Sequence, residues 1–445
     1  MTSNPPSWTS GRRSTSPTQR LVIVVRADPV ICGHSGEARN LAEVAIERGF
    51  DDVRIVTWPI EVVQAAGLPL KPLDTVMPYS PGITVERPGA VGDYKVPDGR
   101  FTSAMKGRLF ELFTDGVPTV CLSLYLLPHA TVVQEALVAA RASGLPCNVV
   151  TLAEAVGSDI TNIARNCVTD GQLGAAAYLF STYLAHDHCL AVSDFTKQQI
   201  VESAEVVDDE LGSTFAPQCR RRVRISYPAI DTAAYIGIEP ALIAPVLRGR
   251  GLEQDQYVLF LSRITPAKGV DDLIDAYRRS AVRHRMPLVI AGTGPNLGAM
   301  RARAEASFDE GGVVVFFDDV DDAEKSVLMA GCAAYALPSK PAVEFVETFG
   351  IALVEKMLAG GGPIITTRTG GIPEAVGDTA IDIPAGDPAA LADALDLATL
   401  GLSAAERRSR ADLARAHAVQ FDRGVVFDRM MEPVMLPLER DLALA

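Results

Sequence analysis

The stretch LVIVVRADPVICGHSGEARN, residues 21–40, decides the fold. It opens with five consecutive apolar residues, LVIVV, a run typical of a strand that is buried on both faces of a parallel sheet. A polar, glycine-containing loop follows from Arg26 to Gly36, and the apolar spacing after it predicts an amphipathic helix from about Glu37 to Arg48. A strand, a loop and a helix in this order are the first unit of a doubly wound α/β domain.

The same alternation continues along the chain in two series. The first series runs to CLAVS at 189–193, and a charged stretch at 202–224 then interrupts it. The second begins with YVLFLSR at 257–263 and ends with AIDIPAG at 380–386. We therefore predict an α/β protein with two Rossmann-like, doubly wound parallel-sheet domains that face a cleft. The predicted divisions are a disordered tail over 1–19, an N-terminal domain over 20–210, a C-terminal domain over 225–420, and a helix over 421–445 that could return to the N-terminal domain.

Composition excludes several classes of partner. The chain of 445 residues has 41 Lys and Arg against 55 Asp and Glu, a net charge of −14. Such an acidic surface is unsuited to nucleic acid or to an anionic membrane, so a local cluster of donors must hold any anionic ligand. No apolar run reaches the roughly 20 residues that a membrane span needs, and residues 1–19 lack the apolar core of a secretory signal. We expect a cytoplasmic protein, and the sequence does not predict its oligomeric state.

The cysteines and the acidic loop at 318–324 argue against a bound metal. Seven scattered cysteines, without a CxxC pair, indicate a reducing cytosol rather than a disulfide framework or a zinc site. Asp319-Val320-Asp321 has the form of a metal-binding DxD, but these acids are expected to solvate a loop and cap a helix. We predict no metal and no cofactor.

Polar groups cluster at the predicted carboxyl ends of strands, where open α/β sheets bind ligands. Arg263 and Lys268 follow the strand at 257–261, and two cations in one loop suit a diphosphate. The alternative is that both are solvated surface charges. Glu347 precedes the run FGIALVEKMLAGG, and Glu355 lies eight residues later. On one helix these carboxylates would lie roughly 12 Å apart along the axis, with the helix N-terminus at Phe349 and Gly350 facing an anion.

Two glycine-containing segments complete the set. The turn Gly370-Gly371-Ile372-Pro373-Glu374 follows the strand at 363–367, and its glycines allow a close approach of backbone to ligand. An ordinary strand-to-helix turn is the alternative. The loop Gly33-His34-Ser35-Gly36 would bring backbone to an anion from the other side of the cleft.

Taken together, these pieces resemble a known family. The blocks SRITPAKGVDDLIDA, IAGTGP, ALPS, ETFGIALVE and TRTGGIPEAV occur in the order and spacing of retaining glycosyltransferases of family 4, which have the GT-B fold. The resemblance covers about residues 185–390. It implies metal-independent transfer of a sugar, with retention, from a nucleoside-diphosphate sugar to a small polar acceptor. The C-terminal domain would then bind the nucleotide sugar, and the N-terminal domain would bind the acceptor.

The resemblance also implies roles for individual residues. Arg263 and Lys268 would neutralise the donor diphosphate, and Glu347 would contact the donor sugar; these three form the predicted catalytic set. Glu355 would bind the ribose. The predicted donor-binding residues are Gly36, Thr348, Phe349, Gly350, Glu355, Gly292 and Gly294. The loop VTLAEAVGSDI at 150–160 resembles the acceptor-side loop of the family, which gives Gly157, Ser158, Asp159 and Glu154 as acceptor-side residues.

The chain departs from the family pattern at two places. Ala153 and Glu154 stand where many relatives carry a histidine, and Asp318 replaces a frequent glycine. In its first half the chain is similar to actinobacterial antibiotic-pathway members such as the lincosamide S-glycosyltransferase. That similarity implies a GDP-sugar donor and a thiol or hydroxyl acceptor. A nucleotide-sugar epimerase, a phosphorylase on the same fold, and a non-catalytic nucleotide-sugar-binding protein are the alternatives.

Overall fold

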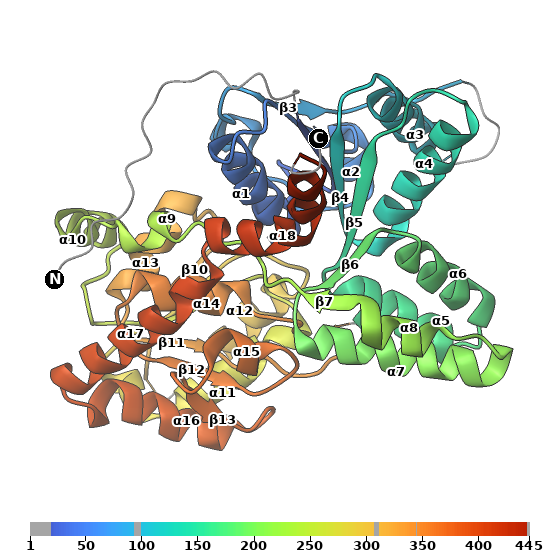
Figure 1. The fold of residues 1–445 in the computed structure, drawn as a ribbon. Helices are drawn as coiled ribbons and strands as arrows, with labels where there is room; N and C mark the ends of the chain where they lie inside the picture. The colour runs from blue at the N-terminus through green and yellow to red at the C-terminus, as the bar shows by residue number, and fades with distance from the viewer. Residues whose placement is uncertain (1–18, 93–98, 307–310, 344, 443–445) are drawn as a thin grey trace, which may run out of the picture.

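The computed structural model describes residues 19–92, 99–306, 311–343 and 345–442. Two parallel sheets organise the chain, and helices cover both faces of each (Figure 1). The predicted fold class, two doubly wound α/β domains, is therefore confirmed. Residues 1–18 of the predicted disordered tail lie outside the described residues.

The first sheet has seven strands in the order β3-β2-β1-β4-β5-β6-β7, all paired in parallel. Its order reverses direction at β1, as expected of a doubly wound sheet. In chain order the strands are β1 (Arg20–Val24), β2 (Asp52–Val56), β3 (Ile83–Glu86), β4 (Thr119–Leu124), β5 (Val149–Ala155), β6 (His188–Ala191) and β7 (Val223–Ile225). The helices that accompany them are α1 (Gly33–Glu47), α2 (Ile60–Ala65), α3 (Gly99–Thr114), α4 (Thr131–Ala142), α5 (Arg165–Thr169), α6 (Leu173–Leu184), α7 (Asp194–Leu211) and α8 (Phe215–Arg222).

The second sheet has six strands in the order β10-β9-β8-β11-β12-β13, also parallel. Its strands are β8 (Val258–Leu261), β9 (Leu288–Ala291), β10 (Val314–Phe317), β11 (Ala334–Leu337), β12 (Ile364–Thr367) and β13 (Ile381–Ile383). Its helices are α9 (Ala233–Ile236), α10 (Pro240–Gly249), α11 (Val270–Arg279), α12 (Leu297–Glu305), α13 (Asp322–Gly331), α14 (Ile351–Ala359), α15 (Ile372–Val376), α16 (Pro388–Asp396) and α17 (Ala404–Ala418).

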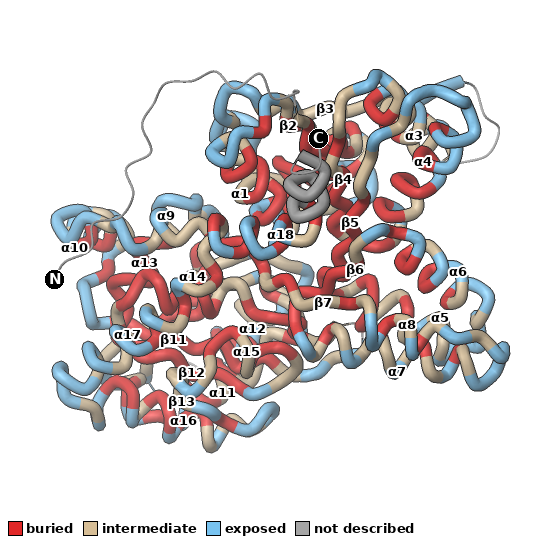
Figure 2. The backbone as a smooth tube through the Cα atoms, viewed as in Figure 1, coloured by how far each residue is buried: buried red, intermediate tan, exposed pale blue. Residues whose placement is uncertain are grey.

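Strand β1 shows why its sequence folds this way. Leu21 and Ile23 join the apolar cluster beneath α1, whereas Val22 and Val24 join the cluster beneath α3 and α4. Because side chains alternate across a strand, a strand covered on both faces must be apolar at every position. Figure 2 shows the result, with buried strands and with exposed residues along the outer sides of the helices.

The first sheet extends further along the chain than the prediction placed it. The charged stretch at 202–224, which interrupts the first series of predicted elements, forms part of α7, then α8, and then the edge strand β7. The stretch therefore belongs to the first sheet. The real crossover follows it, where Ile230 exchanges backbone hydrogen bonds with Phe421 (3.0 Å) and Arg423 (2.8 Å).

The last helix, α18 (Arg423–Leu442), lies beside α1 in Figure 1. Phe427 and Met430 are buried in the same apolar cluster as Leu41 of α1, and the Phe427 ring meets Phe50 edge-on at 6.1 Å. The chain thus crosses between the two sheets twice, at 226–232 and at 419–423, and these two segments pair with each other.

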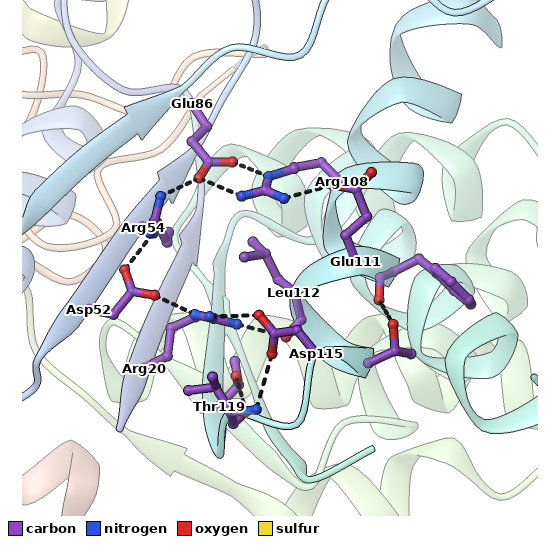
Figure 3. Close-up of polar contacts among 12 residues, drawn as sticks. Arg20, Asp52, Arg54, Glu86, Arg108, Glu111, Leu112, Asp115 and Thr119 are labelled. Carbon is purple, nitrogen blue, oxygen red and sulfur yellow. Dashed lines mark hydrogen bonds and ion pairs between the residues drawn. The ribbon is translucent and has the colours of Figure 1, made fainter. Parts of the chain in front are cut away.

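An ion-pair network connects the first residue of β1 to β2 and to the end of α3 (Figure 3). Arg20 is 5% exposed and donates to Asp52 (2.7 Å), to Asp115 (2.8 Å) and to the carbonyl oxygen of Leu112 (2.8 Å). A cation at the carboxyl end of α3 also complements the helix dipole. Losing Arg20 would leave a half-buried Asp52 and the last turn of α3 without their shared donor.

We predict that Arg20→Met lowers the free energy of unfolding by about 2–3 kcal/mol, because it strands carboxylates that are only partly exposed. Urea denaturation would measure the loss. Arg48→Met is the matched control: its exposed pair with Asp428 (2.7 Å) should contribute no more than about 1 kcal/mol. Equal losses in the two variants would contradict the role given to the Arg20 network.

Candidate active site between the two sheets

The predicted catalytic residues converge on loops at the carboxyl ends of the second sheet. Arg263 follows β8 and is exposed. Lys268 ends a short 3-10 turn, Pro266–Lys268, and its ammonium group pairs with the Glu347 carboxylate. Both partners are largely enclosed, with side chains 12% and 9% exposed. The structure thus joins Lys268 and Glu347, which are 79 positions apart in the sequence, in one ion pair.

Glycines let the backbones of these loops touch. A Cβ atom on Gly371 would lie 2.0 Å from the carbonyl oxygen of Thr348, and the Gly371 N–H donates to the Glu347 carbonyl oxygen at 2.9 Å. Any side chain at position 371 would therefore push Glu347 and Thr348 away. The double glycine of the GGIPE turn holds the Glu347 backbone in place.

The two glycines predicted to bind the donor have a similar role. A Cβ atom on Gly292 would lie 2.1 Å from the carbonyl oxygen of Ser262, and one on Gly294 would lie 2.2 Å from that of Ile264. Both glycines therefore pack directly against the loop that carries Arg263. Their predicted contact with the donor remains a prediction.

The predicted helix is present, but it begins later in the sequence than expected. The sequence analysis placed both carboxylates along one helix, whereas α14 begins at Ile351, after Gly350 in a left-handed conformation (φ 106°). Glu347 therefore precedes the helix, and the predicted helical separation of Glu347 and Glu355 is wrong. Within the described residues, no hydrogen bond uses the backbone N–H groups of Phe349 or Gly350. These groups can donate to a ligand.

Two aromatic contacts fix this turn. The buried Phe349 ring lies 5.5 Å from Tyr227 and 5.1 Å from Phe421, between centroids. Tyr227 and Phe421 belong to the two crossover segments, so the start of α14 rests on the junction between the sheets.

Glu355 lies within α14, and two other elements hold its carboxylate. It accepts a hydrogen bond from the Tyr235 hydroxyl (2.7 Å) and pairs with Lys325 (2.6 Å). A ribose bound by Glu355 would share this carboxylate with these partners.

The first domain presents a second helix N-terminus to the same place. The segment Gly33–Gly36 was predicted as a loop, but it forms the first turn of α1. A Cβ atom on Gly33 would lie 2.9 Å from the Ile351 side chain, so the starts of α1 and α14 meet across the cleft. Gly36 is exposed, with open space around its α-carbon.

The acceptor-side loop also touches the second domain. The Thr348 hydroxyl donates to the Val156 carbonyl oxygen at 3.4 Å, and a Cβ atom on Gly157 would lie 2.7 Å from that hydroxyl. Ser158 hydrogen-bonds with the Tyr125 hydroxyl at 3.0 Å. The structure thus brings Gly157 and Ser158 to the interface of the two domains, next to donor-side Thr348.

Asp159 organises this loop from inside. Its buried carboxylate accepts backbone N–H bonds from Leu126 (3.0 Å), Val156 (3.3 Å) and Gly157 (2.9 Å). Burial raises the pKa of Asp159 to about 6, although these donors favour the charged form. With its oxygens engaged this way, Asp159 shapes the acceptor-side loop.

Glu154 lies deeper still, in β5, and is fully buried. Burial raises its pKa well above the usual value, and the charge of Glu37, which follows the first turn of α1, raises it further. Burial likewise raises the pKa of Glu37 to about 8. Glu37 accepts the N–H of Ala229 in the crossover (3.2 Å). The structure thus places Glu154 in an interior acid pair rather than at an exposed part of the cleft.

The sequence analysis missed several aromatic and basic groups at the strand ends of the first domain. Tyr125 follows β4 and has a positive φ of 91°, and the guanidinium of Arg26, just after β1, lies 5.1 Å from its ring centroid. His129 and Trp58 are hydrogen-bonded to each other beside them. The signal that could have found them was their position immediately after predicted strands.

The described residues include no group of three or more His, Cys, Asp or Glu that could hold a metal ion. Asp321, of the predicted DxD, caps α13 by accepting the Glu324 N–H at 2.8 Å, and Asp319 pairs with Arg250. None of the described helices is both long and apolar enough to cross a membrane.

Two parallel-sheet domains that meet at the carboxyl ends of their strands define the GT-B fold. Residues 248–412 match the protein-family model "Glycosyl transferases group 1". The Anabaena protein Alr3699/HepE, solved in complex with UDP and glucose, has a similar structure: the TM-score is 0.66 at 17% identity, over 93% of this chain and 99% of the other.

Characterised relatives match in part of their length. "O-antigen chain mannosyltransferase B" of Escherichia coli is 26% identical over 195 residues, 43% of this chain and 46% of the relative. A "GDP-mannose-dependent alpha-(1-6)-phosphatidylinositol monomannoside mannosyltransferase" of Mycobacterium tuberculosis is 31% identical over 221 residues, 46% of this chain and 54% of the relative. The matched regions thus span about half the length of the curated relatives.

The acid pair predicts a pH dependence of stability. Between the unfolded pKa near 4.3 and the raised folded pKa values, the folded protein keeps protons that the unfolded chain releases, so stability falls as pH rises. The slope is at most about 1.4 kcal/mol per pH unit for each carboxyl. We predict that the double variant Glu37→Gln, Glu154→Gln flattens this slope between pH 5 and pH 8, whatever its absolute stability.

Urea denaturation at several pH values would measure the slope. Glu61→Gln, at an exposed position of the same domain, is the control and should keep the wild-type slope. An unchanged slope in the double variant would show that the pair is ionised in the folded protein.

Proposed function

We propose that this chain is a retaining, metal-independent glycosyltransferase of family 4 that moves a sugar from a nucleoside-diphosphate sugar to a small polar acceptor. One observation carries the proposal. Arg263 and the Lys268–Glu347 pair lie on the loops that follow the neighbouring strands β8 and β11, and the second of these loops leads into α14, within the region that matches glycosyl transferases group 1.

The chemistry suits this arrangement. As the bond between the anomeric carbon and the diphosphate oxygen breaks, negative charge builds on the leaving diphosphate. The Arg263 guanidinium and the N–H groups at the start of a helix would stabilise that charge more than they stabilise the ground state. The acceptor atom bonds to the anomeric carbon from the same face, and its proton passes to the leaving phosphate.

Each type of contact that the family resemblance implies then has a residue to make it. Glu347 would accept a donor-sugar hydroxyl while Lys268 keeps its carboxylate in place. Glu355 would bind the ribose, with Tyr235 and Lys325 orienting its carboxylate at 2.7 and 2.6 Å. Gly36 would meet the phosphates from α1, which starts opposite α14.

The donor base in this proposal is guanine. Support comes from relatives whose names specify GDP-mannose and from the N-terminal similarity to antibiotic-pathway enzymes. A thiol or hydroxyl acceptor and a role in actinobacterial secondary metabolism belong to the same proposal. A cytoplasmic location fits the free state of all seven cysteines.

We predict that Lys268→Ala and Glu347→Ala each lower turnover at least tenfold, a loss of about 1.4 kcal/mol or more in transition-state stabilisation. Each change leaves the other charge without its partner and removes a donor contact. Turnover would be followed with labelled GDP-mannose, first alone and then with pools of small acceptors. Lys106→Ala is the control, because it breaks an exposed ion pair (2.6 Å) between Lys106 on α3 and Glu135 on α4.

Wild-type turnover in both variants would refute the assigned site. Release of free nucleotide with sugar transferred to an acceptor would separate a transferase from an epimerase, which returns an isomeric nucleotide sugar. A thermal-shift panel of UDP, GDP, ADP and dTDP would identify the base. A nucleotide at a hundred times its dissociation constant adds about 2.7 kcal/mol of stability.

A further inference from the structure

Arg26 is a cation without a counter-ion at the carboxyl end of β1. Its half-buried guanidinium lies over the Tyr125 ring, 5.1 Å from the centroid. Among the described residues it makes no hydrogen bond and no ion pair. The nearby Asp28 is already paired with Arg39 at 2.9 Å. A half-buried guanidinium that stacks on an aromatic ring and has no counter-ion can bind an anion through its free edge.

The groups around Arg26 come from three neighbouring strand ends. The His34 ring, on α1, lies 6.1 Å from the Tyr125 ring, and the His129 ring lies 6.2 Å from it. Trp58, after β2, donates its indole N–H to Nε2 of His129 at 3.2 Å. These rings form an aromatic surface beside one guanidinium, at the sheet edge where α/β proteins bind ligands.

Neither histidine neutralises or adds to this charge near neutral pH. Burial, together with the charges of Arg26 and Arg263, lowers the pKa of His34 to about 3. Burial and Arg26 lower the pKa of His129 to about 3. Both rings are therefore neutral, and Arg26 carries the uncompensated positive charge on the first-domain side of the cleft.

His129 provides a second observation, because one of its ring nitrogens lacks a hydrogen-bond acceptor. The side chain is 1% exposed, and its Nδ1 atom has no hydrogen-bond partner among the described residues. Since Trp58 donates to Nε2, the proton of the neutral ring lies on Nδ1. A buried donor without an acceptor costs about 1–3 kcal/mol unless a ligand or water satisfies it.

The donor diphosphate already has its partners in the second domain. Arg263, Lys268 and the start of α14 belong to the second domain, whereas Arg26 follows β1 of the first. On the basis of the proposed function, we propose that Arg26 and Tyr125 form the acceptor subsite and that the acceptor carries an oxyanion, a carboxylate or a phosphate. Arg26 would bind the oxyanion through the edge of its guanidinium, which stacking on Tyr125 leaves open.

Small aromatic acids test this subsite without knowledge of the true acceptor. Benzoate and phenyl phosphate supply the two oxyanions on a ring that the neighbouring side chains can contact, and benzamide is the neutral match for benzoate. Binding to the full chain saturated with GDP would be followed by saturation-transfer NMR. We expect at least one acid to bind and benzamide to bind at least tenfold more weakly, and the better acid tells carboxylate from phosphate.

Variants of Arg26 then test whether binding of the acid depends on this residue. Arg26→Gln should weaken binding of the acid at least tenfold and leave GDP affinity unchanged. Arg26→Lys keeps the positive charge and should bind the acid more tightly than Arg26→Gln does. Arg141→Gln, at an exposed arginine on α4, is the matched control and should bind like the wild type.

Four results would overturn the subsite. The first three are failure of both acids to bind, equal binding of benzamide, and acid binding that Arg26→Gln leaves intact. The fourth is a tenfold loss of GDP affinity in Arg26→Gln, which would instead assign Arg26 to the donor diphosphate. Failure of the wild-type protein to bind any nucleotide would count against the proposed function, which distinguishes the two failures.

Discussion

Backbone-to-backbone contact among the loops of the second sheet is the constraint on which the site depends. Gly269 lies so close to Pro338 that a Cβ atom would sit 2.1 Å from its carbonyl oxygen, and Gly292 and Gly371 make equally close approaches to other loops. Loops packed at this distance cannot shift independently, because protein interiors resist even small changes in volume. Preorganised charges are what stabilisation of a leaving group requires.

The two domains are joined by specific contacts as well as by the chain. Glu374, in the GGIPE turn, accepts the first backbone N–H groups of α7 from Asp194 (2.8 Å) and Phe195 (3.1 Å), so one domain caps a helix of the other. On another side of the interface, Lys71 pairs with Asp322 at 2.6 Å. The paired crossovers and the return of α18 complete the junction. Opening of the cleft would have to break these polar contacts while the crossovers act as the hinge.

Periodicity predicted the fold well because parallel strands buried on both faces read as continuous apolar runs, as in β1. It missed β3 and β7, whose short edge segments, ITVE and VRI, are only partly buried and carry charges. Local patterns also could not place helix starts: α1 begins four residues before Glu37, and Gly350 separates Glu347 from α14. The sequence indicated which residues the proposed site would use. It could not show that Glu154 is interior or that Arg26 is unpaired, since both depend on contacts between distant segments.

The central claim is that a departing diphosphate is held between Arg263 and the start of α14. A crystal structure with GDP bound tests this most directly. We expect the β-phosphate to accept hydrogen bonds from the Arg263 guanidinium and from the backbone N–H groups of Phe349 or Gly350, with the ribose on Glu355. A nucleotide bound elsewhere, with these donors still facing solvent, would contradict the account.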